Sequence, residues 1–179
     1  MPPPEGYLIT WTTYATRLHG HAGGSTDHAR DGHGPTRLKP DPRLLARRAR
    51  VMREPAFHLG PEAREIVGRA IRAVATHNRW ALLALAVRSN HVHLLIRAHQ
   101  PPERVMTACK SWATRALREA GAIEDRAKVW TRHGSTRWIN DKDDLSRAFE
   151  YVTEWQEGGL AAARYGARPG AMRSDKPRP

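Results

Sequence analysis

The sequence predicts an α+β sandwich, in which an antiparallel sheet of about four strands carries helices on one face. Two observations predict this class. Short segments rich in β-branched and aromatic residues alternate with longer segments whose apolar residues recur at helical spacing. Two of the strand-like segments are separated only by a short turn, whereas helical segments separate the others. Strands that are interrupted by helices in this order are typical of a sheet covered by helices.

Four segments have the composition of strands, and they span residues 7–14, 80–87, 91–97 and 129–139. The tripeptide Arg88-Ser89-Asn90 predicts a turn that joins the second and third strands as a hairpin. The third strand is rich in apolar residues on both of its faces, which is typical of a central strand. Gly134 interrupts the fourth strand and predicts a bulge or a bend there.

Three helices are predicted from start signals, end signals and apolar stripes. The first begins at Pro61, the second begins at residues 101–103 and ends at Gly121, and the third begins at Asp141 and ends near residues 158–159. We expect one domain over residues 1–160. Within it, residues 15–55 form a surface excursion that includes a short helix over residues 42–52, capped by Asp41. We expect a basic, disordered tail over residues 161–179.

The chain is strongly basic, since 30 Lys and Arg residues oppose 18 Asp and Glu residues and give a net charge of +12. Such a charge attracts polyanions, and we expect nucleic acid as the partner. The codon bias of GC-rich genomes is an alternative explanation for the excess of Arg over Lys, but it explains the net charge less well. No apolar run reaches the roughly 20 residues that span a membrane, and the single cysteine excludes an internal disulfide. We therefore expect a cytoplasmic, nucleoid-associated protein without a membrane partner.

The motif with the clearest chemical meaning is His91-Val92-His93. The two-residue period of a strand places both imidazoles on one face and Val92 on the other. Two imidazoles side by side can chelate one divalent ion, although a third ligand must come from another element. The alternative, two half-exposed strand residues without a ligand, fits a central strand less well, because burying two imidazoles without partners is costly.

The segment Asn90-His91-Val92-His93-Leu94-Leu95-Ile96 resembles the histidine-hydrophobic-histidine motif of the HUH endonucleases. More narrowly, residues 7–158, apart from the excursion, are similar to the single-tyrosine transposases of small insertion sequences and to the REP-associated tyrosine transposases. The resemblance implies a ferredoxin-like (RRM-like) fold. It also implies a catalytic tyrosine on the helix after the last strand, and that helix carries Tyr151.

The resemblance implies that Tyr151 attacks a phosphodiester of single-stranded DNA to form a 5′-phosphotyrosine link, with a divalent metal, Mg or Mn, beside it. From the residues alone, Tyr151 is better explained as an amphipathic residue that packs on the flank of an apolar stripe, and only the resemblance favours the nucleophile. Family members take their third metal ligand from the tyrosine helix. Trp155 occupies the usual position here, and it cannot ligate. Glu154 has the better helical geometry, whereas Gln156 has the amide that the family prefers, and we favour Gln156 slightly.

Five further residues are candidates for contacts with DNA. The resemblance places the last strand near the DNA, where Arg132 and Arg137 would hold phosphates and Trp130 or Trp138 would stack on a base. Lys110 would belong to a basic stripe on the second helix. In each case the alternative is ordinary structure: tryptophans in the core, and basic side chains on a solvated surface.

These observations predict a metal-dependent tyrosine transposase that nicks and rejoins single-stranded, hairpin-forming DNA, and that acts as a monomer or a homodimer. One rival is a non-catalytic RRM-like nucleic-acid-binding protein. It is less favoured because His91 and His93 stand where an RRM carries stacking aromatics. Another rival is a metal-dependent hydrolase that uses water and forms no covalent intermediate.

Overall fold

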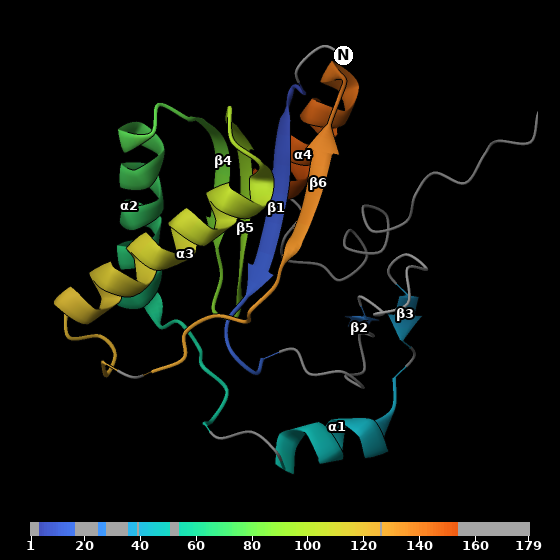
Figure 1. Ribbon diagram of the computed structural model, residues 1–179, viewed down its shortest axis with the longest axis vertical. Helices are drawn as coiled ribbons and strands as arrows, with labels where there is room; N and C mark the ends of the chain where they lie inside the picture. The colour runs from blue at the N-terminus through green and yellow to red at the C-terminus, as the bar shows by residue number, and fades with distance from the viewer. Residues whose placement is uncertain are drawn as a thin grey trace, which may run out of the picture.

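A computed structural model describes residues 4–16, 25–27, 36–38, 40–50, 54–125 and 127–153. The elements in chain order are β1 (Gly6–Thr12), β2 (Ser25–Asp27), β3 (Thr36–Leu38), α1 (Pro42–Arg50), α2 (Pro61–His77), β4 (Ala81–Val87), β5 (His91–Arg97), α3 (Pro102–Glu119), β6 (Ser135–Ile139) and α4 (Lys142–Thr153). Figure 1 shows their arrangement.

The main sheet has four antiparallel strands in the order β4-β5-β1-β6. Without the small excursion strands, the chain runs strand, helix, two strands, helix, strand, helix. This order places the first and third strands of the sheet at its centre, which is the ferredoxin-like arrangement. The predicted fold class, the central position of β5 and the β4–β5 hairpin are therefore confirmed.

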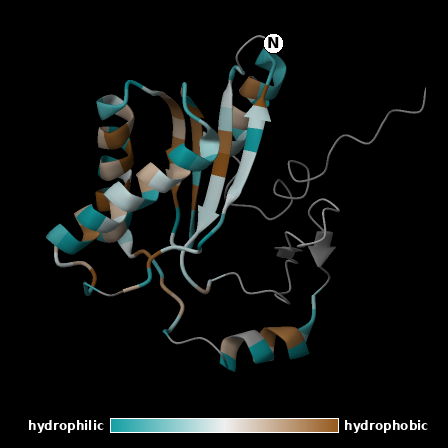
Figure 2. Ribbon diagram, in the orientation of Figure 1, coloured by the Kyte–Doolittle hydropathy of each residue, from teal (hydrophilic) through white to brown (hydrophobic). Residues whose placement is uncertain are grey.

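Helices cover both faces of the sheet, so the expectation of helices on one face was wrong for α4. One face packs against α2 and α3 through a large cluster that includes Ile9, Trp11, Leu94 and Ile96. The other face packs against α4 through a smaller cluster: Leu8, Ala84, Leu95, Ile139, Ala148 and Val152. Because β4 contributes apolar side chains to both clusters, the sheet requires a cover on each side. Figure 2 shows apolar residues along the strands and the helices that cover them. Figure 1 shows α3 crossing in front of the sheet and α4 behind it.

The predicted helix starts are confirmed. The Asp41 carboxylate accepts hydrogen bonds from the backbone N–H groups of Arg43 and Leu44, and the Asp141 carboxylate accepts one from Asp144 at 2.8 Å. These contacts satisfy amide groups that would otherwise lack a partner at a helix start. Prolines occupy the first turns of α2 and α3, where their missing N–H costs nothing.

The last strand is shorter than predicted. Trp130 forms an isolated bridge with Thr13, and regular pairing with β1 resumes only at Ser135. Residues 131–133 bulge between these two points because their carbonyl groups accept hydrogen bonds from the Lys110 ammonium group instead of from a neighbouring strand. The predicted irregularity at Gly134 is therefore confirmed, and the bulge extends on its N-terminal side.

The excursion between β1 and α2 contains the predicted helix α1 and also a short pair of strands, β2 and β3, that the sequence analysis did not predict. The tail over residues 161–179 lies outside the described residues, and the domain boundaries stay a prediction. Within the described part of the chain, no helix combines the length and the apolar character needed to cross a bilayer.

Cys109 lies on the inner side of α3 and is fully buried in the larger cluster. Burial raises the pKa of its thiol to about 12. The side chain therefore acts as a small apolar group of the core, as the helical stripe predicted.

Gly134 allows a close approach between the bulge, β1 and α3. A Cβ atom at this position would lie 2.6 Å from the carbonyl oxygen of Thr10 and against the sulfur of Met106. We predict that Gly134→Ala lowers the free energy of unfolding by about 1–3 kcal/mol, the usual cost of overpacking, when measured by urea denaturation. Gly60→Ser is the control, since that position has open space around it and is the N-cap of α2. Equal stability of Gly134→Ala and wild type would show that the bulge can shift freely.

Candidate active site

Side-chain alternation on the two central strands places the candidate site on the face that α4 covers. Val92, Leu94 and Ile96 of β5 point into the larger cluster, whereas Leu95 points toward α4. His91 and His93 have the parity of Leu95, so both imidazoles lie on the α4 face. Thr10 of β1 is paired with His93 in register and lies on the same face.

The two imidazoles are adjacent, and a hydrogen bond orients each ring. Their ring centres lie 4.7 Å apart with an interplanar angle of 79°. Nδ1 of His93 lies 2.8 Å from the hydroxyl oxygen of Thr10, and Nδ1 of His91 lies 2.6 Å from the side-chain oxygen of Asn90. A ring that donates through Nδ1 presents the lone pair of Nε2, which is the form that binds a metal.

Tyr151 lies on the inner side of α4, directly against the histidines. The rings of Tyr151 and His93 lie 5.2 Å apart at 84°, an edge-to-face contact. His93 is only 6% exposed, and Tyr151 is half-buried at the border of the smaller cluster. The structure thus brings together the three side chains that the sequence analysis placed at the centre of the site, in a single chain.

The donor set fits a divalent metal as far as the described residues reach. Two imidazoles with oriented Nδ1 groups are suitable ligands, but within the described ranges no three His, Cys, Asp or Glu side chains gather as a metal site. Both candidates for the third ligand, Glu154 and Gln156, lie outside the described residues. Their roles stay predictions.

Two of the residues predicted to bind DNA have structural contacts on the α3 side. The Lys110 ammonium group donates to the carbonyl oxygens of Thr131, Arg132 and His133 at 2.9–3.5 Å, and burial lowers its pKa to about 8. The Trp130 indole N–H donates to α3, and its ring packs edge-on against Trp11. Both side chains hold the bulge against the core in this geometry.

Arg137 lies on the α4 face and links β6 to the first turn of α4. Its guanidinium group lies 2.8 Å from the Asp144 carboxylate, which also binds Arg147 at 2.7 Å. The hydrogen bond from Arg147 and the nearby charge of Arg137 lower the pKa of Asp144. This pairing fixes the start of the helix that carries Tyr151.

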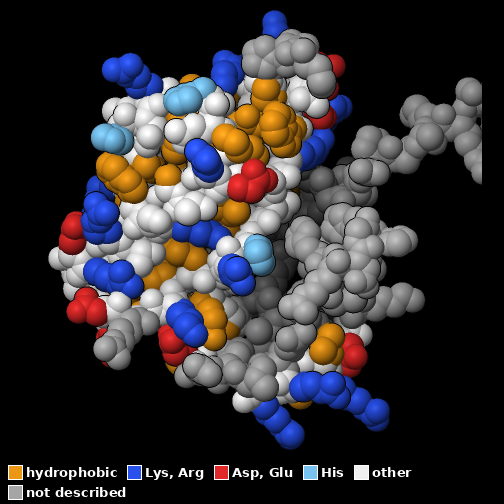
Figure 3. Space-filling view, viewed as in Figure 1, with side chains coloured by type: hydrophobic (Ala, Val, Ile, Leu, Met, Phe, Trp, Pro, Cys, Tyr) orange, Lys and Arg blue, Asp and Glu red, His pale blue; other side chains and the backbone are white. Residues whose placement is uncertain are grey.

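Two other candidates for DNA contacts are accessible. Arg132 is exposed on the bulge, and Trp138 is 53% exposed beside the ring of Tyr7. Figure 3 shows Lys and Arg side chains distributed over the α2–α3 side of the molecule rather than gathered in one patch. The predicted DNA contacts of these residues are not tested by the geometry.

The two residues that orient the imidazoles, Asn90 and Thr10, were not predicted from the sequence. Asn90 immediately precedes His91, so a local signal for it existed. Thr10 is 83 residues from His93, and only the register between β1 and β5 reveals their contact.

Fold and site together define a ferredoxin-like domain in which a pair of histidines on a central strand faces a tyrosine on the last helix. A profile of the family described as "Transposase IS200 like" matches residues 51–155, which is more than half of the chain and includes all three of these side chains. The chain therefore belongs to the IS200-like transposase family. No curated protein sequence matches it.

Solved structures of two transposases are similar to this chain. One is a REP-associated tyrosine transposase bound to a REP hairpin, with 12% identity and a TM-score of 0.47 over 84% of this chain and 66% of that one. The other is a putative transposase from Deinococcus radiodurans R1, with 14% identity and a TM-score of 0.47 over 85% of this chain and 91% of that one.

The contact between Thr10 and His93 gives a test of the site's geometry. We predict that Thr10→Val keeps the fold but lowers affinity for Mn²⁺ about 10- to 100-fold, the usual effect of losing a group that orients a metal ligand. Isothermal titration with Mn²⁺ measures the affinity, and histidine ¹⁵N chemical shifts report which ring nitrogen carries the proton. Thr12→Val is the matched control, since Thr12 lies on the same face of β1 and bonds to Thr131 instead. Equal effects of both variants would contradict a positioning role for Thr10.

The pKa of Lys110 gives a test of its burial. Because folding lowers this pKa from 10.5 to about 8, the unfolded chain binds the proton more tightly between these pH values, and stability from this group rises with pH there. We predict that the free energy of unfolding of wild type, relative to that of Lys110→Met, increases from pH 8 to pH 10.5. Below pH 7 the difference between the two proteins should be constant. Urea denaturation at several pH values measures it, with the exposed Lys142→Met as control. A flat difference across the range would contradict the burial.

Proposed function

We propose that this protein is a transposase that cleaves single-stranded DNA with Tyr151 as the nucleophile, at a site where His91 and His93 hold a divalent metal. The observation that carries the proposal is the contact between the Tyr151 and His93 rings, with the ring of His91 next to that of His93. A buried imidazole, a half-buried imidazole and a half-buried tyrosine that meet at one point can act together in phosphoryl transfer. Separate packing roles would not require them to meet.

The reaction is a transesterification. The Tyr151 oxygen attacks the scissile phosphorus, the bond from phosphorus to the 3′ oxygen breaks, and the leaving 3′ oxygen ends protonated as a hydroxyl group. The tyrosine proton is lost, and DNA remains attached through a 5′-phosphotyrosine. The number of phosphoester bonds does not change, so a 3′-hydroxyl can later attack the link and rejoin a strand without a nucleotide cofactor.

The protein's own contribution is to hold the reacting groups in place. His91 and His93 are fixed by Asn90 and Thr10, and a Mg²⁺ or Mn²⁺ ion bound there would polarise the phosphate and favour the charged leaving oxygen. Gln156, with Glu154 as the alternative, would complete its ligands. The packing of α4 on the sheet holds the Tyr151 ring beside His93, which limits the motion needed for attack.

The proposed substrate is hairpin-forming single-stranded DNA. The net charge of +12 supports a polyanionic partner, and membership in a transposase family favours DNA over RNA. Because His93 and Tyr151 meet within one chain, the geometry supports a site assembled by one subunit, whether the protein is a monomer or a homodimer.

The proposal predicts a covalent intermediate. Wild-type protein incubated with a labelled REP-type hairpin bearing single-stranded flanks and Mg²⁺ or Mn²⁺ should form a protein–DNA adduct that survives denaturing electrophoresis. The adduct should be lost in Tyr151→Phe and in His91→Ala, because one removes the attacking oxygen and the other a metal ligand. Tyr14→Phe is the matched control and should keep the adduct.

The other outcomes distinguish the rivals. Cleavage without an adduct would identify a water-using hydrolase, and DNA binding without cleavage under any metal would identify a binding module. Adduct formation in Glu154→Ala but not in Gln156→Ala would assign the third ligand to Gln156. If a mixture of His91→Ala and Tyr151→Phe proteins regained activity, the site would be shared between subunits.

A further inference from the structure

The groove between α2 and the edge strand β4 lies on the opposite face of the sheet from the histidines. It is an open depression of about 340 Å³ whose lining includes Arg64, Glu65, Gly68, Arg72, Leu85 and Val87. This volume is at the small end of the range for ligand pockets, roughly 300–1,000 Å³, and suits a short stretch of nucleic-acid backbone. From this groove we propose a second DNA contact: Arg64 and Arg72 each bind a backbone phosphate of the DNA strand that enters the active site.

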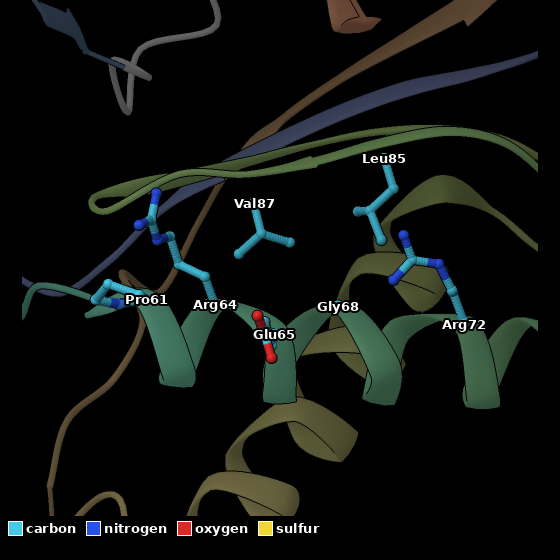
Figure 4. A pocket seen from close by; sticks show the side chains of 7 residues that line it. All are labelled: Pro61, Arg64, Glu65, Gly68, Arg72, Leu85 and Val87. Atoms are coloured by element: carbon cyan, nitrogen blue, oxygen red, sulfur yellow. The ribbon is translucent and has the colours of Figure 1, made fainter.

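Arg64 is the first reason for the proposal. Its Nε atom is buried and has no hydrogen-bond partner among the described residues. A buried guanidinium donor without an acceptor is unfavourable, so an acceptor supplied by a ligand would satisfy it. Figure 4 shows its guanidinium group directed toward the end of the β4–β5 hairpin.

Gly68 is the second reason. A Cβ atom there would lie 3.0 Å from a guanidinium nitrogen of Arg72, so the Arg72 side chain lies directly over the glycine, and its flexible end would have to shift to accommodate alanine. Glycine inside a helix is less favourable than alanine, and its presence in the buried face of α2 is explained by the space it provides. Arg64 and Arg72 thus mark the two ends of the groove, with Leu85 and Val87 between them (Figure 4).

The charge of the groove is positive despite Glu65. Glu65 also lines the groove, but its side chain is 75% exposed and lies 3.8 Å from Arg69, so two arginines and one largely solvated carboxylate leave the groove with a net positive charge. Arginine donates two hydrogen bonds to one phosphate and stays charged at every physiological pH, so two arginines at this separation suit the phosphates of a polyanion.

The position of the groove relates it to the active site. Val87 pairs with Val92, next to His91, and Asn90 of the connecting turn bonds to His91. The groove and the histidines therefore lie on opposite faces at the same end of the β4–β5 hairpin. A strand that crosses this turn would contact both, which would direct its scissile phosphate toward Tyr151. The inference rests on the proposed function in taking DNA as the ligand.

The test measures binding of a fluorescent single-stranded oligonucleotide to the full chain as a function of salt. Arg64→Gln and Arg72→Gln should each weaken binding several-fold and reduce the slope of log K against log salt by about 0.7, the value for one lost phosphate contact on a single strand. Arg118→Gln is the matched control, since Arg118 is exposed at the end of α3. Slopes that fall equally in all three variants would overturn the proposal.

Gly68→Ala separates groove geometry from net charge. It keeps both arginines but displaces the Arg72 guanidinium group, so we expect weaker binding with a thermal midpoint that is unchanged or higher. If Gly68→Ala binds the oligonucleotide as wild type does while the arginine variants bind it more weakly, the effect is one of overall charge. That result would contradict a DNA contact in the groove. A second titration uses inorganic phosphate: variants that lose phosphate binding but keep oligonucleotide binding would identify a free anion as the ligand and overturn the DNA contact.

Adduct formation distinguishes this inference from the function on which it rests. The arginine variants should need more DNA for half-maximal adduct formation and reach the wild-type rate at saturation, whereas His91→Ala should not reach it at any concentration. If wild type forms no adduct, the proposed function fails, and the salt slopes still decide whether the groove binds DNA.

Discussion

The side-chain alternation of β1 and β5 at the centre of the sheet is the constraint on which the site depends. Each strand has one set of residues in the core shared with α2 and α3, and the other set faces α4. A shift of one residue in the pairing of these strands would exchange the two sets and place the imidazoles in the larger core. The apolar residues that flank the histidines therefore specify the location of the site as much as the histidines do.

The polar groups inside this layer are satisfied in pairs. His93 is almost completely buried, and the hydroxyl of Thr10 on the adjacent strand supplies its partner at 2.8 Å. On the other side of the sheet, Lys110 reaches the carbonyl groups of the bulge before β6. In both cases a polar side chain that would be costly to bury without a partner forms hydrogen bonds with a second segment of the chain. These hydrogen bonds hold the two segments together. Rigid strands and helices that are held in this way position reacting groups more accurately than loops do.

Much of the fold could be predicted from the sequence because the signals are local. Pro61 and Gly121 mark helix ends through their backbone conformation, Asp141 does so through its carboxylate, and the short turn at residues 88–90 favours the hairpin. The position of α4 could not be predicted in this way. Its apolar stripe shows only that one side is buried, and the two-sided character of β4 and β5, which requires a second cover, becomes evident once the sheet order is known. The end of β6 was also misplaced, since the donor that draws its carbonyl groups away is on α3.

The site shows the same division. His91 and His93 could be predicted as neighbours from strand geometry alone, and Tyr151 could be placed only through the resemblance to a family. The contact of Tyr151 with His93 depends on how α4 crosses the sheet, which no local pattern encodes. Among the residues predicted to contact DNA, Lys110 and Trp130 have partners within the protein instead. The sequence could not reveal this, because a basic or aromatic residue looks the same in sequence whether its side chain faces solvent or a backbone carbonyl group.

The burial of Cys109 has a practical consequence. It is the only cysteine of the chain, and its thiol is inaccessible and has a pKa raised to about 12. Alkylating reagents that target cysteine act on the thiolate, so the native protein presents no reactive thiol. A cysteine introduced at an exposed position such as Ser146 on α4 would therefore be the only point that accepts a maleimide dye. Movement of the tyrosine-bearing helix could then be followed by fluorescence without removing any native residue from the core.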